Sequence, residues 1–178
     1  TTFNCFGQSV FDNHYDYDSL YNGTLCVANT KDGGFVAGDE IYNFFTGYAA
    51  ILVRKFNCKG DTIWSKKYDL CPSSGEQVSS ILEDAFGYIL VFGDIHDTID
   101  NNSDFFVLKL NQNGDSIWFK QYGEPDYYNN YAFAIITNDG GYAFVGKSGY
   151  TDSAGNSYPS DINLLKLDFF GNLLWEKY

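Results

Sequence analysis

The sequence predicts an all-β fold built from one four-stranded unit that occurs three times, and three observations predict it. The 178 residues include 16 Phe, 15 Tyr and 18 Gly but only 3 Pro and no Met, which is typical of strands joined by tight turns. One phrase ending in Trp occurs three times, and its tryptophans lie 54 and 57 residues apart. A second phrase, Asp-Gly-Gly-aromatic or a variant of it, precedes each copy in the same order.

The Trp phrase predicts a hairpin. An apolar strand with a lysine leads into an Asx-x-x-Gly-Asx turn, in which the Asx side chain can bond the backbone ahead and Gly can take a positive φ. Two copies then continue as Trp-x-Lys-x-Tyr, and strand alternation places Trp and Tyr on one face. The repeated positions are Lys55, Lys109 and Lys166, then Gly60, Gly114 and Gly171, then Trp64, Trp118 and Trp175.

The Asp-Gly-Gly phrase predicts a second turn, so each unit has four strands. A four-stranded unit with a period near 54 residues is typical of a β-propeller blade, because a β-helix or leucine-rich repeat would have a shorter period and a sandwich would not need to repeat. The expected strands are 24–30, 34–38, 50–57 and 61–68 in blade 1 (about 24–68), 78–83, 87–93, 104–110 and 115–122 in blade 2 (78–122), and 131–137, 141–146, 161–167 and 172–178 in blade 3 (131–178).

The first seven residues predict a lone strand. Residues 2–7 align with 118–123, the fourth strand of the second unit and the Gly after it, so we expect residues 1–7 to be a closing strand. Propellers have about four to eight blades, and three blades with a spare strand do not complete one. We therefore expect 1–178 to be a single β-propeller region and an N-terminal excerpt of a longer chain, with a ring assembled from several chains as the alternative.

The two phrases carry a family resemblance. Asp-Gly-Gly-Tyr/Phe followed by Leu-Leu-Lys-Leu-Asp-x-x-Gly-Asn-x-x-Trp-x-Lys resembles a blade repeat of secreted β-propeller proteins of the Bacteroidetes, which often carry a type IX secretion sorting domain. The resemblance covers nearly the whole chain, and it implies a secreted or cell-surface location. It departs from the pattern at residues 84–87, which lack the double Gly.

Charge argues against two classes of partner. The net charge is -12, from 23 Asp and Glu against 11 Lys and Arg. Such a surface repels a phosphate backbone, so we expect no nucleic-acid partner. No apolar run reaches the roughly 18 residues of a membrane helix, so we expect no membrane insertion.

The four cysteines do not suggest a zinc site, because they lack CxxC spacing. Cys5, Cys26, Cys58 and Cys71 permit three sets of two pairs. Local spacing favours Cys58 with Cys71 and Cys5 with Cys26. The pairing stays open at this stage.

Other motifs predict little chemistry. Residues 141–148 match the phosphate-loop pattern GxxxxGK[ST], but their middle is a predicted strand, so nucleotide binding is not expected. A loop rich in oxygen ligands could hold calcium, although it lacks regular calcium-loop spacing and could equally be a solvated loop. Its candidate ligands are Asp94, Asp97, Asp100 and Asp104. No nucleophile motif is present, so no catalytic residue is proposed.

Aromatic residues between the expected strands are the candidate binding groups, because they can stack on sugars or anchor a protein. The set comprises Tyr42, Phe44, Phe45, Tyr127, Tyr128, Tyr150 and Tyr158, and the ligand-binding candidates are Tyr127, Tyr128, Tyr150 and Tyr158. The expected function is a non-catalytic binding or scaffold module for protein or glycan at the propeller rim, linked to further blades. The alternatives are a polysaccharide-active enzyme domain and a purely structural part of a surface assembly.

Overall fold

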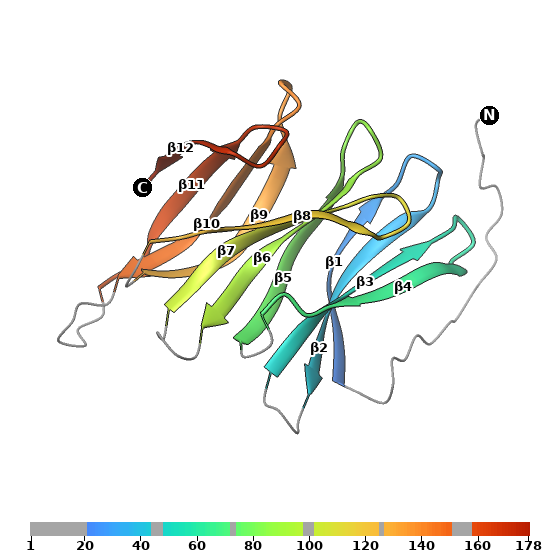
Figure 1. Ribbon diagram of the computed structural model, residues 1–178, viewed down its shortest axis with the longest axis horizontal. Coiled ribbons are helices and arrows are strands. Elements are labelled where there is room, and N and C mark those ends of the chain that lie inside the picture. The colour runs from blue at the N-terminus through green and yellow to red at the C-terminus, as the bar shows by residue number, and fades with distance from the viewer. Residues whose placement is uncertain (1–20, 44–47, 72–73, 98–101, 125–126, 151–157) are drawn as a thin grey trace.

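The computed structural model is all-β (Figure 1). It describes residues 21–43, 48–71, 74–97, 102–124, 127–150 and 158–178. None of these residues is helical. The expected closing strand at residues 1–7 lies outside the described residues.

In the described ranges, twelve strands form three antiparallel units of four, as the sequence predicts. Within each unit, every strand pairs with the next along the chain. The first unit holds β1 (Tyr21–Asn29), β2 (Phe35–Asn43), β3 (Tyr48–Phe56) and β4 (Thr62–Tyr68), the second β5 (Ser74–Glu83), β6 (Ile89–Asp97), β7 (Asn102–Leu110) and β8 (Ser116–Tyr122), and the third β9 (Tyr127–Ile136), β10 (Tyr142–Tyr150), β11 (Asp161–Leu167) and β12 (Leu173–Lys177).

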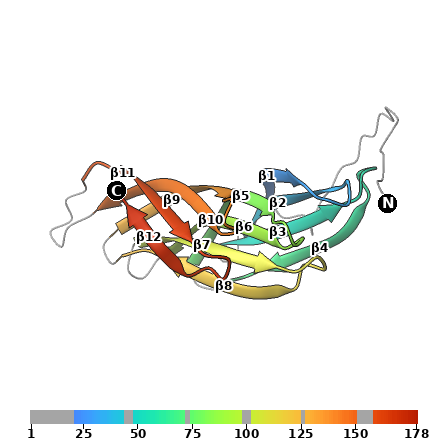
Figure 2. The same cartoon turned by 90° about the horizontal axis from the view of Figure 1, so that it is seen from above.

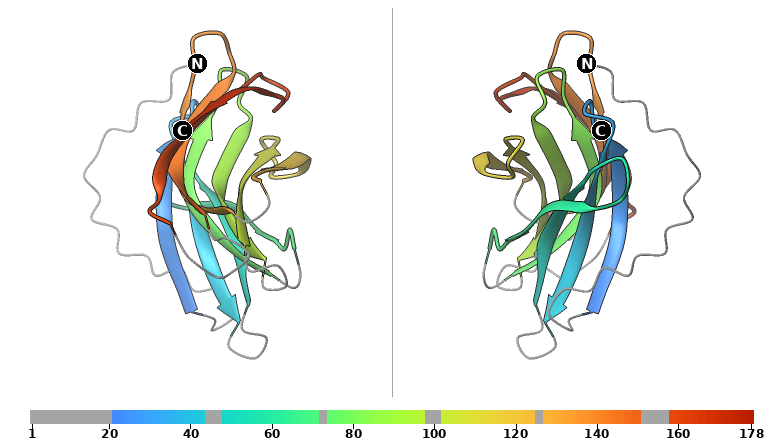
Figure 3. Two further views of the ribbon diagram at one scale, coloured as in Figure 1. Left: turned by 90° about the vertical axis from the view of Figure 1, so that its left-hand side faces the viewer. Right: turned by 90° about the vertical axis from the view of Figure 1, so that its right-hand side faces the viewer.

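The three units lie side by side in chain order, and each sheet is twisted (Figures 1, 2 and 3). A single parallel pair, Ser103 of β7 with Tyr128 of β9, joins the second unit to the third. The described strands do not close into a ring.

Strand ends differ from the prediction in a regular way. The first strand of each unit begins three or four residues early, and the second strand ends four or five residues late. Gly38, Gly93 and Gly146 suggest strand ends in the sequence, yet each is an interior strand position. Glycine is needed at Gly93 because a Cβ there would lie 1.9 Å from the carbonyl oxygen of Gln77.

The Asx-x-x-Gly-Asx turns form as expected. Asn57 Oδ1 accepts hydrogen bonds from the backbone N–H groups of Lys59 and Asp61, at 2.8 and 3.0 Å. Asn111 and Asp168 do the same in the other units. The turn glycines have φ of 86°, 76° and 75° at Gly60, Gly114 and Gly171, which explains why glycine recurs there.

A buried lysine fixes the other turn in each unit. Lys55 Nζ donates to Thr30 Oγ1 at 2.7 Å and to both carboxylate oxygens of Asp32 at 2.8 and 2.9 Å. Lys166 Nζ donates to Asp139 Oδ1 at 3.0 Å in the third unit. The repeated lysines are therefore structural: each ties the third strand of its unit to the turn between the first two.

The second unit supplies the carboxylate from a different place. Asp84 occupies the position of Thr30, while Phe86 replaces Asp32. The turn closes in the same way, because Asp84 Oδ1 accepts from the N–H groups of Phe86 and Tyr88 at 2.9 and 3.0 Å. This relocated carboxylate explains how the turn forms without a double glycine.

The core lies between the units. The middle strands of the second unit are buried on both faces, so their apolar residues are continuous rather than alternating. One face packs on the first unit, and its cluster includes Val36, Ile51, Val53, Val78, Val91, Phe106 and Leu108. The other packs on the third unit, and its cluster includes Phe92, Phe105, Val107, Tyr142, Phe144 and Leu165.

The cysteines differ from the favoured pairing. Cys58 is disulfide-bonded, whereas neither Cys26 nor Cys71 takes part in a disulfide. The pairs Cys58–Cys71 and Cys5–Cys26 are therefore both wrong, because closeness in sequence does not bring those thiols together. The partner of Cys58 lies outside the described residues. Burial raises the pKa of the Cys26 thiol to about 12, so this group is poorly reactive.

A carboxylate is buried at the start of the second unit. Glu76 of β5 is 1 % exposed, and its Oε1 accepts from the N–H groups of Leu70 and Cys71 at 3.0 and 2.7 Å. Its Oε2 has no hydrogen-bond partner among the described residues. Burial raises the pKa of Glu76 to about 7, and nearby Asp69 adds to the rise.

Glu76 should make the protein less stable as pH rises. Below pH 4.5 the group is protonated in both states, and between 4.5 and about 7 only the unfolded state releases the proton. The free energy of unfolding therefore falls across this window, by about 3 kcal/mol from this group. Urea denaturation at pH 4 and pH 8 should show Glu76→Gln losing less stability than the wild type. Equal losses in both proteins would contradict this prediction.

Candidate functional site

The first and second units are joined by a set of side chains from one face of β4. Trp64 Nε1 donates to the Gln112 carbonyl at 2.9 Å, and Tyr68 OH donates to the Gly114 carbonyl at 2.5 Å. Between them, Lys66 Nζ lies 2.7 Å from Asp115 Oδ1. The predicted placement of Trp and Tyr on one face is confirmed. All three groups bind the β7–β8 turn, and we call this arrangement the seam clasp.

The second and third units repeat the seam clasp. Lys120 Nζ donates to the Phe170 carbonyl and to Asn172 Oδ1, each at 2.9 Å, and Tyr122 OH donates to the Gly171 carbonyl at 2.8 Å. A Cβ on Gly171 would lie 2.8 Å from the Trp118 ring. Two features therefore require glycine at position 171: its positive φ and the Trp118 ring packed against it.

Trp175 carries the same motif in the third unit. It is 41 % exposed, in contrast to the partly buried Trp64 and Trp118. Lys177 Nζ lies 5.9 Å from its ring centroid. The three repeated tryptophans therefore occupy equivalent strand positions but two kinds of surroundings.

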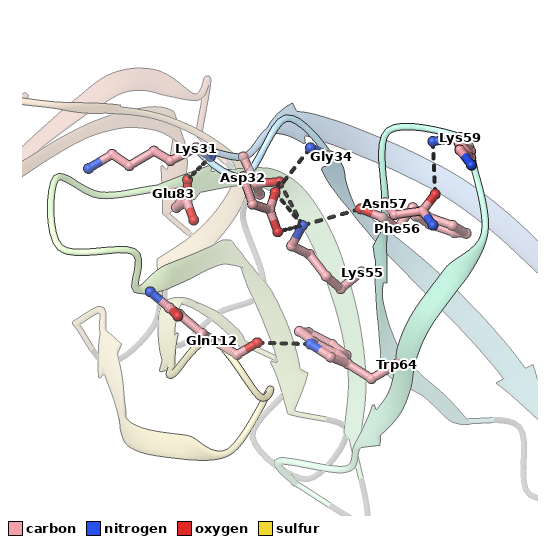
Figure 4. Close-up of polar contacts among 11 residues, drawn as sticks. Lys31, Asp32, Gly34, Lys55, Phe56, Asn57, Lys59, Trp64, Glu83 and Gln112 are labelled. Carbon is pink, nitrogen blue, oxygen red and sulfur yellow. Dashed lines mark hydrogen bonds and ion pairs between the residues drawn. The ribbon is translucent and has the colours of Figure 1, made fainter. Parts of the chain in front are cut away.

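A cleft of about 310 Å³ opens in the seam between the first two units. Figure 4 shows Asp32 and Lys55 facing each other on one side and Gln112 beside Trp64. We call this space the seam cleft. Its walls come from the β1–β2 turn, β3 and β4 on one side, and from the two turns of the second unit with the adjacent ends of β5 and β6 on the other. The lining residues are Lys31, Asp32, Lys55, Ile63, Glu83, Ala85, Phe86, Gly87, Ile89, Gln112 and Asn113.

Each charged side chain that lines the seam cleft already has a hydrogen-bond partner, and Lys55 and Asp32 form an ion pair. Burial raises the pKa of Asp32, but hydrogen bonds from Lys55, Thr30 and the N–H of Gly34 outweigh it and lower the pKa to about 2. Glu83 accepts from the backbone N–H of Lys31 at 2.6 Å, and Lys31 Nζ donates to the Ala85 carbonyl. Two cations and two anions thus line a cleft with no net formal charge.

The equivalent lysine in the next seam is enclosed by rings. Lys109 is 1 % exposed, and its Nζ lies 3.4 Å from the ring centroid of Phe169 and 4.5 Å from that of Tyr88. Lys109 Nζ also donates to Tyr142 OH at 2.8 Å and lies 3.4 Å from Asp84 Oδ2. Burial lowers the pKa of Lys109, and the charge of Asp84 opposes this shift.

Three of the four predicted ligand tyrosines lie together on the third unit. The Tyr127 and Tyr150 ring centroids are 5.3 Å apart, and those of Tyr150 and Tyr158 are 5.6 Å apart at 30°. Tyr178 extends the row, 6.0 Å from Tyr127. We call these four residues the tyrosine ladder. Tyr128 is not part of it, because it faces His96 at 6.4 Å.

Two of the four ladder residues lie on strands, which the sequence did not predict. Tyr127 belongs to β9 and Tyr150 to β10, where loops were expected, and Tyr42 and Tyr128 are likewise strand residues. Phe44 and Phe45 lie outside the described residues. Tyr178 was missed because residues 172–178 were interpreted only as the fourth strand of blade 3. Partial burial and the neighbouring Glu176 raise the pKa of Tyr178 to about 12.

Two of the four calcium candidates, Asp94 and Asp104, lie on opposite faces of the sheet. In the register of β6 and β7, Asp94 pairs with Phe105 and Asp104 pairs with Ile95, so the two carboxylates leave opposite faces of the sheet. Asp94 instead accepts from the N–H of Tyr131 at 3.1 Å. Asp97 ends β6, and Asp100 lies outside the described residues. Across the described ranges no three His, Cys, Asp or Glu are grouped to hold a metal, and calcium binding stays a prediction.

The phosphate-loop letters fall on a strand. β10 runs through Tyr142–Tyr150, where a phosphate loop would need a turn followed by a helix.

The part of the chain that is described contains no helix with the length and apolar character of a membrane span. No family model and no curated protein matches the chain.

Proposed function

We propose that the chain is part of a secreted or cell-surface β-propeller that binds glycan without cleaving it. The propeller interpretation is supported by three four-stranded units that pack face to face in chain order through equivalent seam clasps. Export is supported by the disulfide at Cys58, because disulfides persist mainly in oxidising compartments. The motif resemblance to exported proteins supports the same location.

The tyrosine ladder is the observation that carries the proposal. Tyr158 is 52 % exposed and Tyr178 is 63 % exposed, so ring surface is open to solvent. Aromatic faces pack on the apolar faces of sugar rings, and the phenol groups supply hydrogen bonds at the edges. Three ladder contacts at centroid spacings of 5.3 to 6.0 Å form a row rather than a single ring. A row suits several consecutive sugar units.

Charge selects among glycans. Glu176 accepts from Tyr178 OH at 3.1 Å and from Asn163 Nδ2 at 2.6 Å, so a carboxylate borders the ladder. The chain as a whole carries a charge of -12. Both features disfavour acidic polysaccharides. We therefore propose a neutral polysaccharide as the ligand.

Affinity electrophoresis in gels containing neutral or acidic polysaccharides tests this function. We expect a neutral polysaccharide to retard the wild type, and Tyr150→Ala and Tyr158→Ala each to weaken binding about tenfold. Phe133→Ala is the matched control, because Phe133 is an exposed aromatic of the same unit outside the ladder. Release of reducing ends would contradict a non-catalytic role. Unchanged migration in every neutral polysaccharide would contradict glycan binding.

A further inference from the structure

The repeat allows the two seams to be compared position by position. Gln112 and Phe169 are each the second residue of their Asx-x-x-Gly-Asx turn, and Lys55 and Lys109 are the equivalent lysines of the preceding units. In the seam between the second and third units, the Phe169 ring covers the lysine and lies 5.4 Å from Phe86. The seam cleft occurs where Gln112 replaces that ring.

The lining of the seam cleft combines flat apolar surface with planar polar groups. Phe86 and Ile63 are 69 % and 54 % exposed. The carboxylates of Asp32 and Glu83 and the carboxamides of Gln112 and Asn113 line the same space. Carboxylates accept and carboxamides both donate and accept, which matches the adjacent hydroxyl groups of a sugar. The apolar residues match its C–H face.

The hydrogen bonds of the charged side chains favour a neutral ligand over an ionic one. Lys55 Nζ is engaged by Thr30, Asp32 and the Phe56 carbonyl, and Lys31 Nζ by the Ala85 carbonyl. An anion would find no ammonium group that is not already hydrogen-bonded there, and Asp32 is already neutralised by Lys55. A neutral polar ligand disturbs none of these contacts.

We propose that the seam cleft binds a single neutral sugar residue, as a second site distant in sequence from the tyrosine ladder. Its volume of about 310 Å³ is at the lower end of the range for small-molecule sites and suits one ring rather than a chain. The inference rests on the proposed function for its ligand class. In this proposal, the seam cleft binds a sugar residue at the end or at a branch of the glycan, and the tyrosine ladder binds the glycan chain.

The test uses the full 178-residue chain and NMR titration with glucose, galactose, mannose and N-acetylglucosamine. We expect at least one sugar to shift the side-chain amide signal of Gln112 in the wild type and in Tyr150→Ala. Gln112→Phe places the residue of the next seam into the cleft, so it should fold normally and bind that sugar at least tenfold more weakly. It should still be retarded by polysaccharide through the ladder.

Phe86→Ala removes the apolar wall without filling the cleft, and it should also weaken sugar binding about tenfold. Wild-type affinity in both variants, or no shift with any of the four sugars, would overturn the seam-cleft inference. If the wild type is not retarded by any neutral polysaccharide but a monosaccharide still shifts the Gln112 signal, the ladder proposal would be overturned instead. The two failures are therefore distinguishable.

Discussion

Replacing Lys109 with alanine is expected to lower the free energy of unfolding by about 3–5 kcal/mol. The ammonium group lies between four aromatic rings and beside Asp84, whose side chain is 3 % exposed. Its removal leaves a buried carboxylate without its counter-charge and opens a cavity among the rings. Urea denaturation followed by tryptophan fluorescence measures the loss.

Two further variants separate charge from packing at this position. Lys66→Ala breaks an exposed ion pair with Asp115 and should cost less than about 1 kcal/mol. Lys109→Met combined with Asp84→Thr removes both buried charges. The new threonine is the residue found at this position in the other units, as Thr30 and Thr137. The pair should recover part of the stability. A loss below 1 kcal/mol for Lys109→Ala would show that the ammonium is not enclosed as described.

Gly93→Ala is expected to cost about 3 kcal/mol or more. The new methyl group would lie 1.9 Å from the Gln77 carbonyl oxygen and 2.6 Å from a ring atom of Phe106, so backbone and core must both move. Gly75→Ala in the same unit is the matched control, because nothing lies within 4 Å of its added methyl group. That change should be neutral or stabilising by up to about 1 kcal/mol.

The Gly93 comparison is measured by thermal and urea unfolding of both variants. If Gly75→Ala and Gly93→Ala destabilise the protein equally, the cost of Gly93→Ala comes from strand propensity. It would then not come from the close approach of the new methyl group to Gln77 and Phe106. Such a result would also contradict the reason given for the late ends of the second strands.

The sequence predicted the strands and turns well because short-range chemistry determines them. The Asx-x-x-Gly-Asx turns need only an Asx side chain and a positive φ at Gly60, Gly114 and Gly171, and these residues repeat visibly. Strand ends were less predictable, since Gly93 is interior for a reason that lies on neighbouring strands. The cysteine pairing failed for the same kind of reason: sequence distance does not measure distance in the fold.

The candidate site was only partly predictable. Tyr127, Tyr150 and Tyr158 were identified by type, but their grouping depends on the pairing of β9 with β10, and Tyr178 joins them from β12's end. The partners of the seam clasp lie 46 to 52 residues beyond each clasp residue and need the fold to be known. The sequence shows that Gln112 and Phe169 differ at equivalent positions. Only the packing of neighbouring units shows that this difference leaves the seam cleft open.

Hydrogen exchange of the tryptophan indole N–H groups tests most directly whether the first two units pack together at the seam. Both the propeller interpretation and the seam cleft depend on this packing. The Trp64 indole N–H is bonded to the Gln112 carbonyl across the seam at 2.9 Å, whereas Trp175 is 41 % exposed. We predict slow exchange at Trp64 and fast exchange at Trp175 under native conditions. Exchange at Trp64 as fast as at Trp175 would show that the first two units are not joined in this way.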